Sequence, residues 1–271
     1  MADLSGQTAL VTGASRGIGF GIAEVLASCG ARTVITARGE DALNAAEKLK
    51  AKGLTAVGMQ SDVTNPSSLK KLMEEIHSLY GPVGILVNNA GVSRVCRFED
   101  MPADMRDLML DINICGTWNC TRAVIEDMLA AGWGRIINVS SVTGSIVSDP
   151  GYSAYATSKA ALIGFTRSLA VEYASRGITV NAILPGYIRT AMVERSARTA
   201  NPRDPEAAIR GIEEGIPMGR LGTPREVGYL AAFLASREAS YITGTSQVFD
   251  GGSTLPETSS MGIRQTAAGK T

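Results

Sequence analysis

Short runs of aliphatic and β-branched residues alternate along the chain with segments whose apolar residues recur every three or four positions. The runs predict strands at 8–12, 33–36, 84–87, 136–139, 178–184 and 247–249, and one more that ends near Asp62. The periodic segments predict helices from about Gly17, at 41–52, through Leu69 to Tyr80, at 106–131 and at 154–175. Because the strand runs are almost continuously apolar, both faces of the sheet should be covered. This alternation predicts an α/β fold with a parallel, doubly wound sheet of about seven strands and helices on both faces.

A glycine-rich turn follows the first strand and separates this fold from an eight-stranded α/β barrel, which has the same alternation and length. The turn reads Thr12-Gly13-Ala14-Ser15-Arg16-Gly17-Ile18-Gly19. Glycines let the backbone approach a pyrophosphate, and the N–H groups at the start of the next helix attract it. The sequence therefore predicts a Rossmann-type single domain over residues 1–254, with a substrate lid at about 191–221 and a C-terminal tail at 255–271.

Composition narrows the functional classes. The 271 residues carry 26 Lys and Arg against 26 Asp and Glu, so a nucleic-acid binder, which needs clustered positive charge, is disfavoured. No apolar stretch reaches the roughly 18 residues of a membrane span, and no cationic start leads into an apolar segment. We expect a cytoplasmic protein that binds neither nucleic acid nor membrane.

The cysteines and the histidine do not suggest a metal site. Cys29, Cys96, Cys115 and Cys120 form no Cys-x-x-Cys pair, and His77, the only histidine, is distant in sequence. We interpret each cysteine as a small buried apolar residue and His77 as a surface residue. Acid–base chemistry should therefore not depend on histidine.

The end of the second strand bears on coenzyme choice. NAD sites usually place an acidic residue there for the ribose 2′-hydroxyl, whereas this chain has Ala37 followed by Arg38. Arg38 can bind a 2′-phosphate, and Arg16 in the glycine turn adds a second cation. The pattern favours NADP(H) over NAD(H).

A tyrosine and a lysine stand one helical turn apart. Tyr155 and Lys159 should share a face of their helix, and an ammonium near a phenol is expected to lower the phenol pKa. Such a tyrosine can exchange a proton with a carbonyl or alcohol oxygen. Ser140 and Ser141 end the fifth strand, at the edge where open α/β sheets bind ligands.

Taken together, the motifs resemble those of the compact branch of the short-chain dehydrogenase/reductase family over nearly the whole chain. The matching motifs are Thr12-Gly13-x-x-x-Gly17-x-Gly19, Asp62-Val63, Asn88-Asn89-Ala90-Gly91, Asn113, Asn138-Val139-Ser140-Ser141, Tyr155-x-x-x-Lys159 and Pro185-Gly186. The tail beyond Gly252 outlasts the usual family end and resembles a bacterial oxidoreductase subgroup.

The resemblance implies roles for individual residues. Tyr155 would be the acid/base, Lys159 would hold the ribose hydroxyls and lower the tyrosine pKa, Ser141 would bind the substrate oxygen, and Asn113 would hold a relay water. Ser141 lies fourteen residues before Tyr155, one more than is usual, so Ser140 stays an alternative; Gly144, three residues after Ser141, favours Ser141. The implied coenzyme-binding residues are Gly13, Ser15, Arg16, Gly17, Ile18, Gly19, Ala37, Arg38, Asp62, Val63, Asn89, Ala90, Gly91, Tyr155, Lys159, Pro185, Gly186, Ile188 and Thr190.

The expected activity is NADP(H)-dependent interconversion of a carbonyl and a secondary alcohol of a small molecule, with no metal. A 3-oxoacyl-[acyl-carrier-protein] reductase is an alternative, although segment 130–134 lacks the basic patch expected before the fifth strand and only Arg176 is nearby. A non-catalytic NADP-sensing regulator is another, disfavoured by the intact Ser141, Tyr155 and Lys159. An extended-branch epimerase would need a longer chain.

Two further expectations concern surfaces. Within the lid, Met192, Ile216 and Met218 are expected to form an apolar inner face toward the substrate. Helices 106–131 and 154–175 carry small or apolar residues on more than one face, and helices of that kind need a second partner. In the family the corresponding helices pair between subunits, so a homotetramer is expected.

Overall fold

The computed structural model describes residues 2–256. Most of the predicted tail, 257–271, lies outside the described residues. The sheet contains seven parallel strands: β1 (Thr8–Thr12), β2 (Arg32–Ala37), β3 (Ala56–Gln60), β4 (Ile85–Asn88), β5 (Gly134–Val139), β6 (Ile178–Pro185) and β7 (Ser246–Phe249). Their order is β3-β2-β1-β4-β5-β6-β7, which confirms the predicted doubly wound sheet. The strand order reverses between β1 and β4, and the crevice at such a reversal is where open α/β sheets bind ligands.

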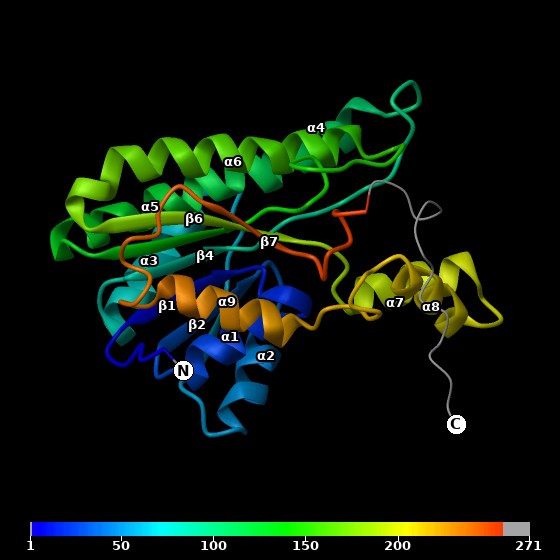
Figure 1. Ribbon diagram of the computed structural model, residues 1–271. Coiled ribbons are helices and arrows are strands. Elements are labelled where there is room, and N and C mark those ends of the chain that lie inside the picture. The colour runs from blue at the N-terminus through cyan, green and yellow to red at the C-terminus, as the bar shows by residue number, and fades with distance from the viewer. Residues whose placement is uncertain (1, 257–271) are drawn as a thin grey trace.

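Helices cover both faces of the sheet (Figure 1). Helices α1 (Gly17–Ser28), α2 (Asp41–Lys50) and α9 (Pro224–Ala235) lie on one face. Helices α3 (Pro66–Tyr80), α5 (Gly116–Ala131) and α6 (Ser153–Tyr173) lie on the other, together with α4 (Ala103–Leu110). Alternate strand residues face the two layers, so Val11 packs with the α1 side and Leu10 with the α3 side.

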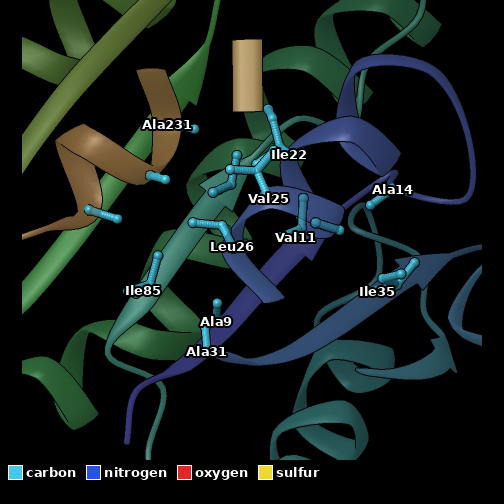
Figure 2. Packing of buried hydrophobic residues seen from close by; sticks show 14 of the residues in the cluster. Ala9, Val11, Ala14, Ile22, Val25, Leu26, Ala31, Ile35, Ile85 and Ala231 are labelled. Carbon is cyan, nitrogen blue, oxygen red and sulfur yellow. The ribbon is translucent and has the colours of Figure 1, made fainter. Parts of the chain in front are cut away.

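Close packing around β1 fixes the N-terminal half of the fold (Figure 2). Ile22, Val25 and Leu26 of α1 are fully buried over the strands. Gly21 and Gly228 allow α1 and α9 to touch, because a Cβ on Gly21 would lie 2.4 Å from the carbonyl carbon of Pro224. A substitution by any larger residue at this crossing would separate the two helices.

Most predicted elements lie within two residues of their observed bounds, but the continuous helix predicted at 106–131 is wrong. The chain there forms α4, a π-helical turn η1 (Asp111–Cys115) and α5. The wider turn frees backbone groups, and the main-chain oxygen of Asn113 accepts a hydrogen bond from the Thr117 hydroxyl at 2.9 Å. π-Helical turns often mark functional sites, and this one contains Asn113.

The expectations about individual cysteine and histidine side chains are confirmed in part. Cys29 and Cys120 are buried as predicted, whereas Cys96 is half-buried and Cys115 is exposed. His77 is exposed, as predicted, and its Nε2 lies 2.8 Å from the Asp127 carboxylate, which also accepts the Val83 N–H at 2.9 Å. This contact ties α3 to α5.

Two further findings concern membrane spans and metal sites within residues 2–256. No helix in this range is long and apolar enough to cross a membrane. The same range contains no group of three or more His, Cys, Asp or Glu side chains arranged to hold a metal ion.

Candidate active site

The glycine turn closes against the strand beside it. Gly13 has φ +62°, and a Cβ there would lie 2.7 Å from the Cα of Ala90. The amide of Asn89 locks the same turn by donating to the carbonyls of Thr12 and Gly13 at 2.8 and 3.0 Å. Within the described chain, no side chain caps the N-terminus of α1 and its first turn contains no acidic residue. The free N–H groups and the helix dipole therefore suit an anion such as a pyrophosphate.

A cavity of about 490 Å³ extends from this turn along the carboxyl ends of β1, β2, β4 and β5. Sixteen of the predicted coenzyme-binding residues line it, namely Gly13, Ser15, Arg16, Gly17, Ile18, Gly19, Ala37, Arg38, Asp62, Val63, Asn89, Ala90, Gly91, Tyr155, Lys159 and Thr190. Its size and anion-binding end fit a dinucleotide.

Three predicted coenzyme-binding residues, Pro185, Gly186 and Ile188, lie outside the cavity lining. The side chain of Ile188 is buried in the core, 4% exposed, and a Cβ on Gly222 would lie 2.8 Å from its Cδ1. Gly186 instead fits against Asp250, since a Cβ there would lie 2.7 Å from the Asp250 Cβ.

Sequence reasoning missed other lining residues. They are Thr36, Gly39, Asp41, Ser61, Val92, Ser93, Ile112, Val139, Ala191 and Arg195. Two more lining residues were expected in other roles: Ser140 as the alternative to Ser141, and Met192 on the inner face of the lid. Many directly follow a predicted strand or flank a predicted motif, so the general position of strand ends could have found them. Nothing in the sequence pattern distinguishes Arg195 from the other arginines of the lid.

The outer end of the cavity carries opposite charges. Arg16 and Arg38 are exposed and line it, and Ala37, the last residue of β2, lines it directly before Arg38. Asp41 and Asp62 line the same region. Burial acts to raise the Asp62 pKa, but hydrogen bonds from the backbone and side chain of Thr64, together with the charge of Arg38, leave it lowered. The Asp62 carboxylate is thus held by its own turn and stays ionised.

Tyr155, Lys159 and Ser140 line the inner end of the cavity, and Ser141 lies next to Tyr155 but outside the lining. Lys159 is buried and donates from Nζ to the Val139 carbonyl at 2.8 Å, while Nζ lies 5.8 Å from the centroid of the Tyr155 ring. The Ser140 hydroxyl donates to the main-chain oxygen of Lys159 at 2.8 Å, so it is occupied in positioning α6. The Ser141 oxygen accepts the Thr143 N–H at 3.1 Å and faces the Tyr155 phenol. Of the two serines, Ser141 is the one directed at the tyrosine.

Asn113 lies behind this group in η1. Its Nδ2 donates to the Val92 carbonyl at 3.0 Å and to the Ser158 hydroxyl at 2.9 Å, and its Oδ1 accepts the Val92 N–H at 2.8 Å. A Cβ on Gly91 would lie 3.2 Å from the Asn113 Oδ1 and 3.5 Å from the Lys159 Nζ. Glycine at position 91 therefore allows this segment to pass close to both side chains.

The pKa of Tyr155 moves opposite to the predicted direction. Burial raises it, and the hydrogen bond with Ser141 offsets only part of that effect. Burial also lowers the pKa of Lys159 to about 8. Desolvation dominates both pKa values, and the Lys159 Nζ is engaged by the Val139 carbonyl while it lies 5.8 Å from the centroid of the Tyr155 ring.

A second group of residues lies beside Tyr155. The rings of Tyr152 and Tyr155 meet edge to face with centroids 6.1 Å apart. Tyr187 is 47% exposed, and burial together with the charge of Asp149 raises its pKa. The turn that carries Asp149 and Tyr152 is anchored by the Cys96 N–H, which donates to the Gly151 carbonyl at 3.1 Å. These residues border the region where a substrate would approach Tyr155.

The predicted lid consists of two helices, α7 (Ala191–Ala200) and α8 (Pro205–Glu214), which lie beyond the carboxyl edge of the sheet (Figure 1). Ala197, Ile209 and Leu221 pack together inside it. The expected apolar inner face is wrong in part. Met192 lines the cavity, but Ile216 is buried against Gly251, and Met218 is 69% exposed.

Comparisons with known proteins show the family of this chain and agree with its fold. A family model described as "Enoyl-(Acyl carrier protein) reductase" matches residues 13–254. The chain is 51% identical over 263 residues to "Oxidoreductase UcpA" of Escherichia coli (strain K12), covering 97% of this chain and 100% of that protein. It is 42% identical to "3-oxoacyl-[acyl-carrier-protein] reductase FabG" of Vibrio cholerae, covering 92% of this chain and 98% of that protein.

A solved structure is similar along almost the same length. It is a gluconate 5-dehydrogenase from Burkholderia cenocepacia in complex with NADP and tartrate, 32% identical, with a TM-score of 0.85, covering 94% of this chain and 97% of that one. The fold and the site are those of an α/β oxidoreductase that uses a nicotinamide coenzyme. The chain belongs to the short-chain dehydrogenase/reductase family, whose members use NAD(H) or NADP(H).

Proposed function

We propose that the protein is an NADP(H)-dependent oxidoreductase that interconverts a carbonyl and a secondary alcohol. The observation that carries the proposal is one cavity with two ends. Its inner end holds Tyr155 and Lys159 beside Ser141, and its outer end holds Arg16 and Arg38 with no acidic residue at position 37.

In this proposal the nicotinamide supplies a hydride to the carbonyl carbon in one direction and accepts it in the other. During reduction Tyr155 gives its phenolic proton to the carbonyl oxygen, so that hydride and proton together make the alcohol. Ser141 donates a hydrogen bond to the same oxygen and stabilises its developing charge. The raised pKa of Tyr155 keeps the phenol protonated at neutral pH, as a proton donor requires.

Lys159 and Asn113 support the tyrosine. The Lys159 ammonium would hold the ribose hydroxyls, and its pKa of about 8 lets it gain or lose a proton near neutral pH. As the family resemblance implies, Asn113 would hold a water that returns a proton to Tyr155 through Lys159. Among the coenzyme contacts, Asp62 and Val63 would border the adenine, and Asn89, Ala90 and Gly91 would border its ribose.

The coenzyme preference follows from the outer end of the cavity. The guanidinium groups of Arg16 and Arg38 could bind the 2′-phosphate from two sides, and Arg38 could stack on the adenine. Charge-assisted contacts of this kind contribute about 1.5–3 kcal/mol, which corresponds to roughly tenfold to a hundredfold selectivity. Asp41 and Asp62 reduce this gain through their negative charge.

A panel of ketones, keto acids and secondary alcohols tests the activity directly. Purified protein is assayed with NADPH and NADH for reduction and with NADP⁺ and NAD⁺ for oxidation, and the Tyr155→Phe variant is the control. Turnover of at least one neutral ketone that disappears in this variant would support the proposal. The absence of turnover across the panel with every coenzyme, despite coenzyme binding, would favour the regulator alternative.

A 3-oxoacyl-carrier-protein reductase is a second candidate because of the similarity to FabG. Against it, the segment Ala130–Gly134 before β5 carries no basic residue to dock an acidic carrier. Comparison of an acetoacetyl thioester bound to acyl carrier protein with the same thioester on a small thiol separates the two. A carrier preference of tenfold or more in kcat/KM would favour this second candidate.

We also propose a homotetramer assembled in part through α5 and α6. Trp118 of α5 is 56% exposed and stacks on Phe165 of α6 with centroids 5.1 Å apart, and Val171 is 85% exposed. Large exposed apolar side chains on neighbouring helices suit a subunit interface. Light scattering should give four times the 28.3 kDa subunit mass, and Val171→Glu should reduce it. A monomer at micromolar concentration would contradict the proposal.

A further inference from the structure

The arginines of the lid and its flanks differ in whether a carboxylate neutralises them. Four have a carboxylate oxygen within 4.0 Å: Arg189, Arg198, Arg210 and Arg220. In the part of the chain that the structure describes, Arg195 and Arg203 have no such partner. Of these two, only Arg195 lines the coenzyme cavity. One unneutralised cation of the lid therefore faces the space where an anionic coenzyme would lie.

The start of α7 lies over the glycine turn. The Thr190 Cγ2 would be 3.6 Å from a Cβ on Gly17, the first residue of α1. Ala191 and Arg195, which both line the cavity, are four residues apart and share one face of α7. Side chains of a helix tilt toward its N-terminus, so the side chain of Arg195 is directed back toward Thr190 and the start of α1.

We propose that Arg195 binds the pyrophosphate of the coenzyme and thereby holds α7 over the bound dinucleotide. The inference rests on the proposed coenzyme site and adds a residue to it. The N-terminus of α1 meets the pyrophosphate from below with backbone N–H groups, and Arg195 meets it from the lid with a charge-assisted hydrogen bond. Because the pyrophosphate is common to both coenzymes, this contact strengthens NADP(H) and NAD(H) alike.

The pyrophosphate contact also couples the lid to coenzyme binding. Within the described residues, α7 buries a single side chain, Ala197, so little apolar burial holds it in place. A guanidinium–pyrophosphate contact would add a restraint that exists only when the coenzyme is bound. Met192 lines the cavity from the same turn of α7, so it would be brought toward the substrate only after the coenzyme has bound.

The test measures dissociation constants rather than turnover. NADP⁺ and NAD⁺ are titrated separately by calorimetry, at low ionic strength, into wild type, Arg195→Gln, Arg195→Lys and the matched control Arg203→Gln. Arg203 is exposed and likewise lacks a carboxylate partner in the described chain, but it does not line the cavity. We expect Arg195→Gln to weaken both coenzymes by the same factor, about tenfold. Arg195→Lys should restore part of the affinity, and Arg203→Gln should stay within twofold of wild type.

Several results would overturn the proposal: unchanged affinity in Arg195→Gln, an equal loss in Arg203→Gln, or a loss confined to NADP⁺, which would place the guanidinium at the 2′-phosphate. A wild type that binds NAD⁺ more tightly than NADP⁺ would contradict the proposed coenzyme preference but would not affect this test, because each coenzyme is compared with itself.

Hydrogen–deuterium exchange over residues 191–200 provides a second readout. At saturating NADP⁺, exchange in this segment should slow in wild type and in Arg203→Gln but much less in Arg195→Gln. Equal slowing in all three proteins would show that Arg195 does not hold α7 and would overturn the coupling.

Discussion

The glycine turn and the lid border the same cavity but are held by different forces. The turn between β1 and α1 is fixed by contact, since Gly13 lies against the backbone of Ala90 and the flanking core is fully buried (Figure 2). The lid is held by a small cluster around Ala197 and Ile209 and by ion pairs between exposed side chains. Exposed ion pairs contribute little to stability. In the proposed function, coenzyme recognition would therefore be built into the tightly packed core, and substrate contacts would come from a less firmly held part of the chain.

The largest expected effect is a loss of kcat, which distinguishes the chemical step at Tyr155 in the fixed region from substrate binding by the lid. Tyr155→Phe should lower kcat by about 10²–10⁴-fold because it removes the proton donor. Coenzyme affinity should stay close to that of wild type, since the ring remains. Met192→Ala, on the cavity side of the lid, should change KM for the substrate with little change in kcat. Steady-state kinetics check both variants; a Tyr155→Phe kcat within a few-fold of wild type would remove the proposed role of Tyr155.

Alanine substitutions of two glycines test how firmly each region is held. Gly13→Ala should destabilise the protein by about 2 kcal/mol or more, because it combines a positive φ with a steric clash against Ala90. Gly211→Ala in α8 has no atom within 4 Å of its new Cβ, and should raise the local helix stability by up to about 1 kcal/mol. Denaturant titration with coenzyme absent gives both values. Equal effects at the two positions would contradict the contrast between the regions.

A smaller effect is the pH dependence of stability that arises from the buried amino group of Lys159. The folded-state pKa of Lys159 is about 8, below its ordinary 10.5, so the unfolded chain binds more protons between these values and wild-type stability should rise with pH there. Below about pH 8 the full penalty for burying the ammonium persists. Lys159→Met lacks this titration, so its stability relative to wild type should be greatest near pH 7 and decline toward pH 10. Thermal unfolding at several pH values checks the trend; a constant difference would show that Lys159 is not desolvated as described.

The sequence predicts the sheet well because each strand is nearly all apolar and each turn is marked by glycine or proline. The sequence also predicts that Tyr155, Lys159 and Ser141 lie at the carboxyl edge of the sheet, since the parallel strands end there and the helices that follow them begin there. The π-helical turn at Asp111–Cys115 cannot be predicted in this way, because the spacing of its apolar residues matches that of the flanking helices.

Charge and solvation at the site were harder to predict. The raised pKa of Tyr155 depends on how deeply the phenol is buried, which only packing decides. Likewise, Ile216 and Met192 are both apolar residues of the predicted lid, yet one is buried and the other lines the cavity. The sequence does not distinguish Arg195 from the other arginines of the lid, because it does not show which of them are paired with a carboxylate.

The outer end of the cavity should select NADP(H) over NAD(H), and the ratio of kcat/KM for NADPH and NADH measures this selectivity. Wild type should favour NADPH by roughly tenfold to a hundredfold, since Arg16 and Arg38 attract the 2′-phosphate. The double substitution Ala37→Asp with Arg38→Ile should reverse the preference, because it adds repulsion and removes attraction at the same place. Equal values for the two coenzymes in wild type, or a preference for NADH, would show that Arg16 and Arg38 do not select the coenzyme with a 2′-phosphate.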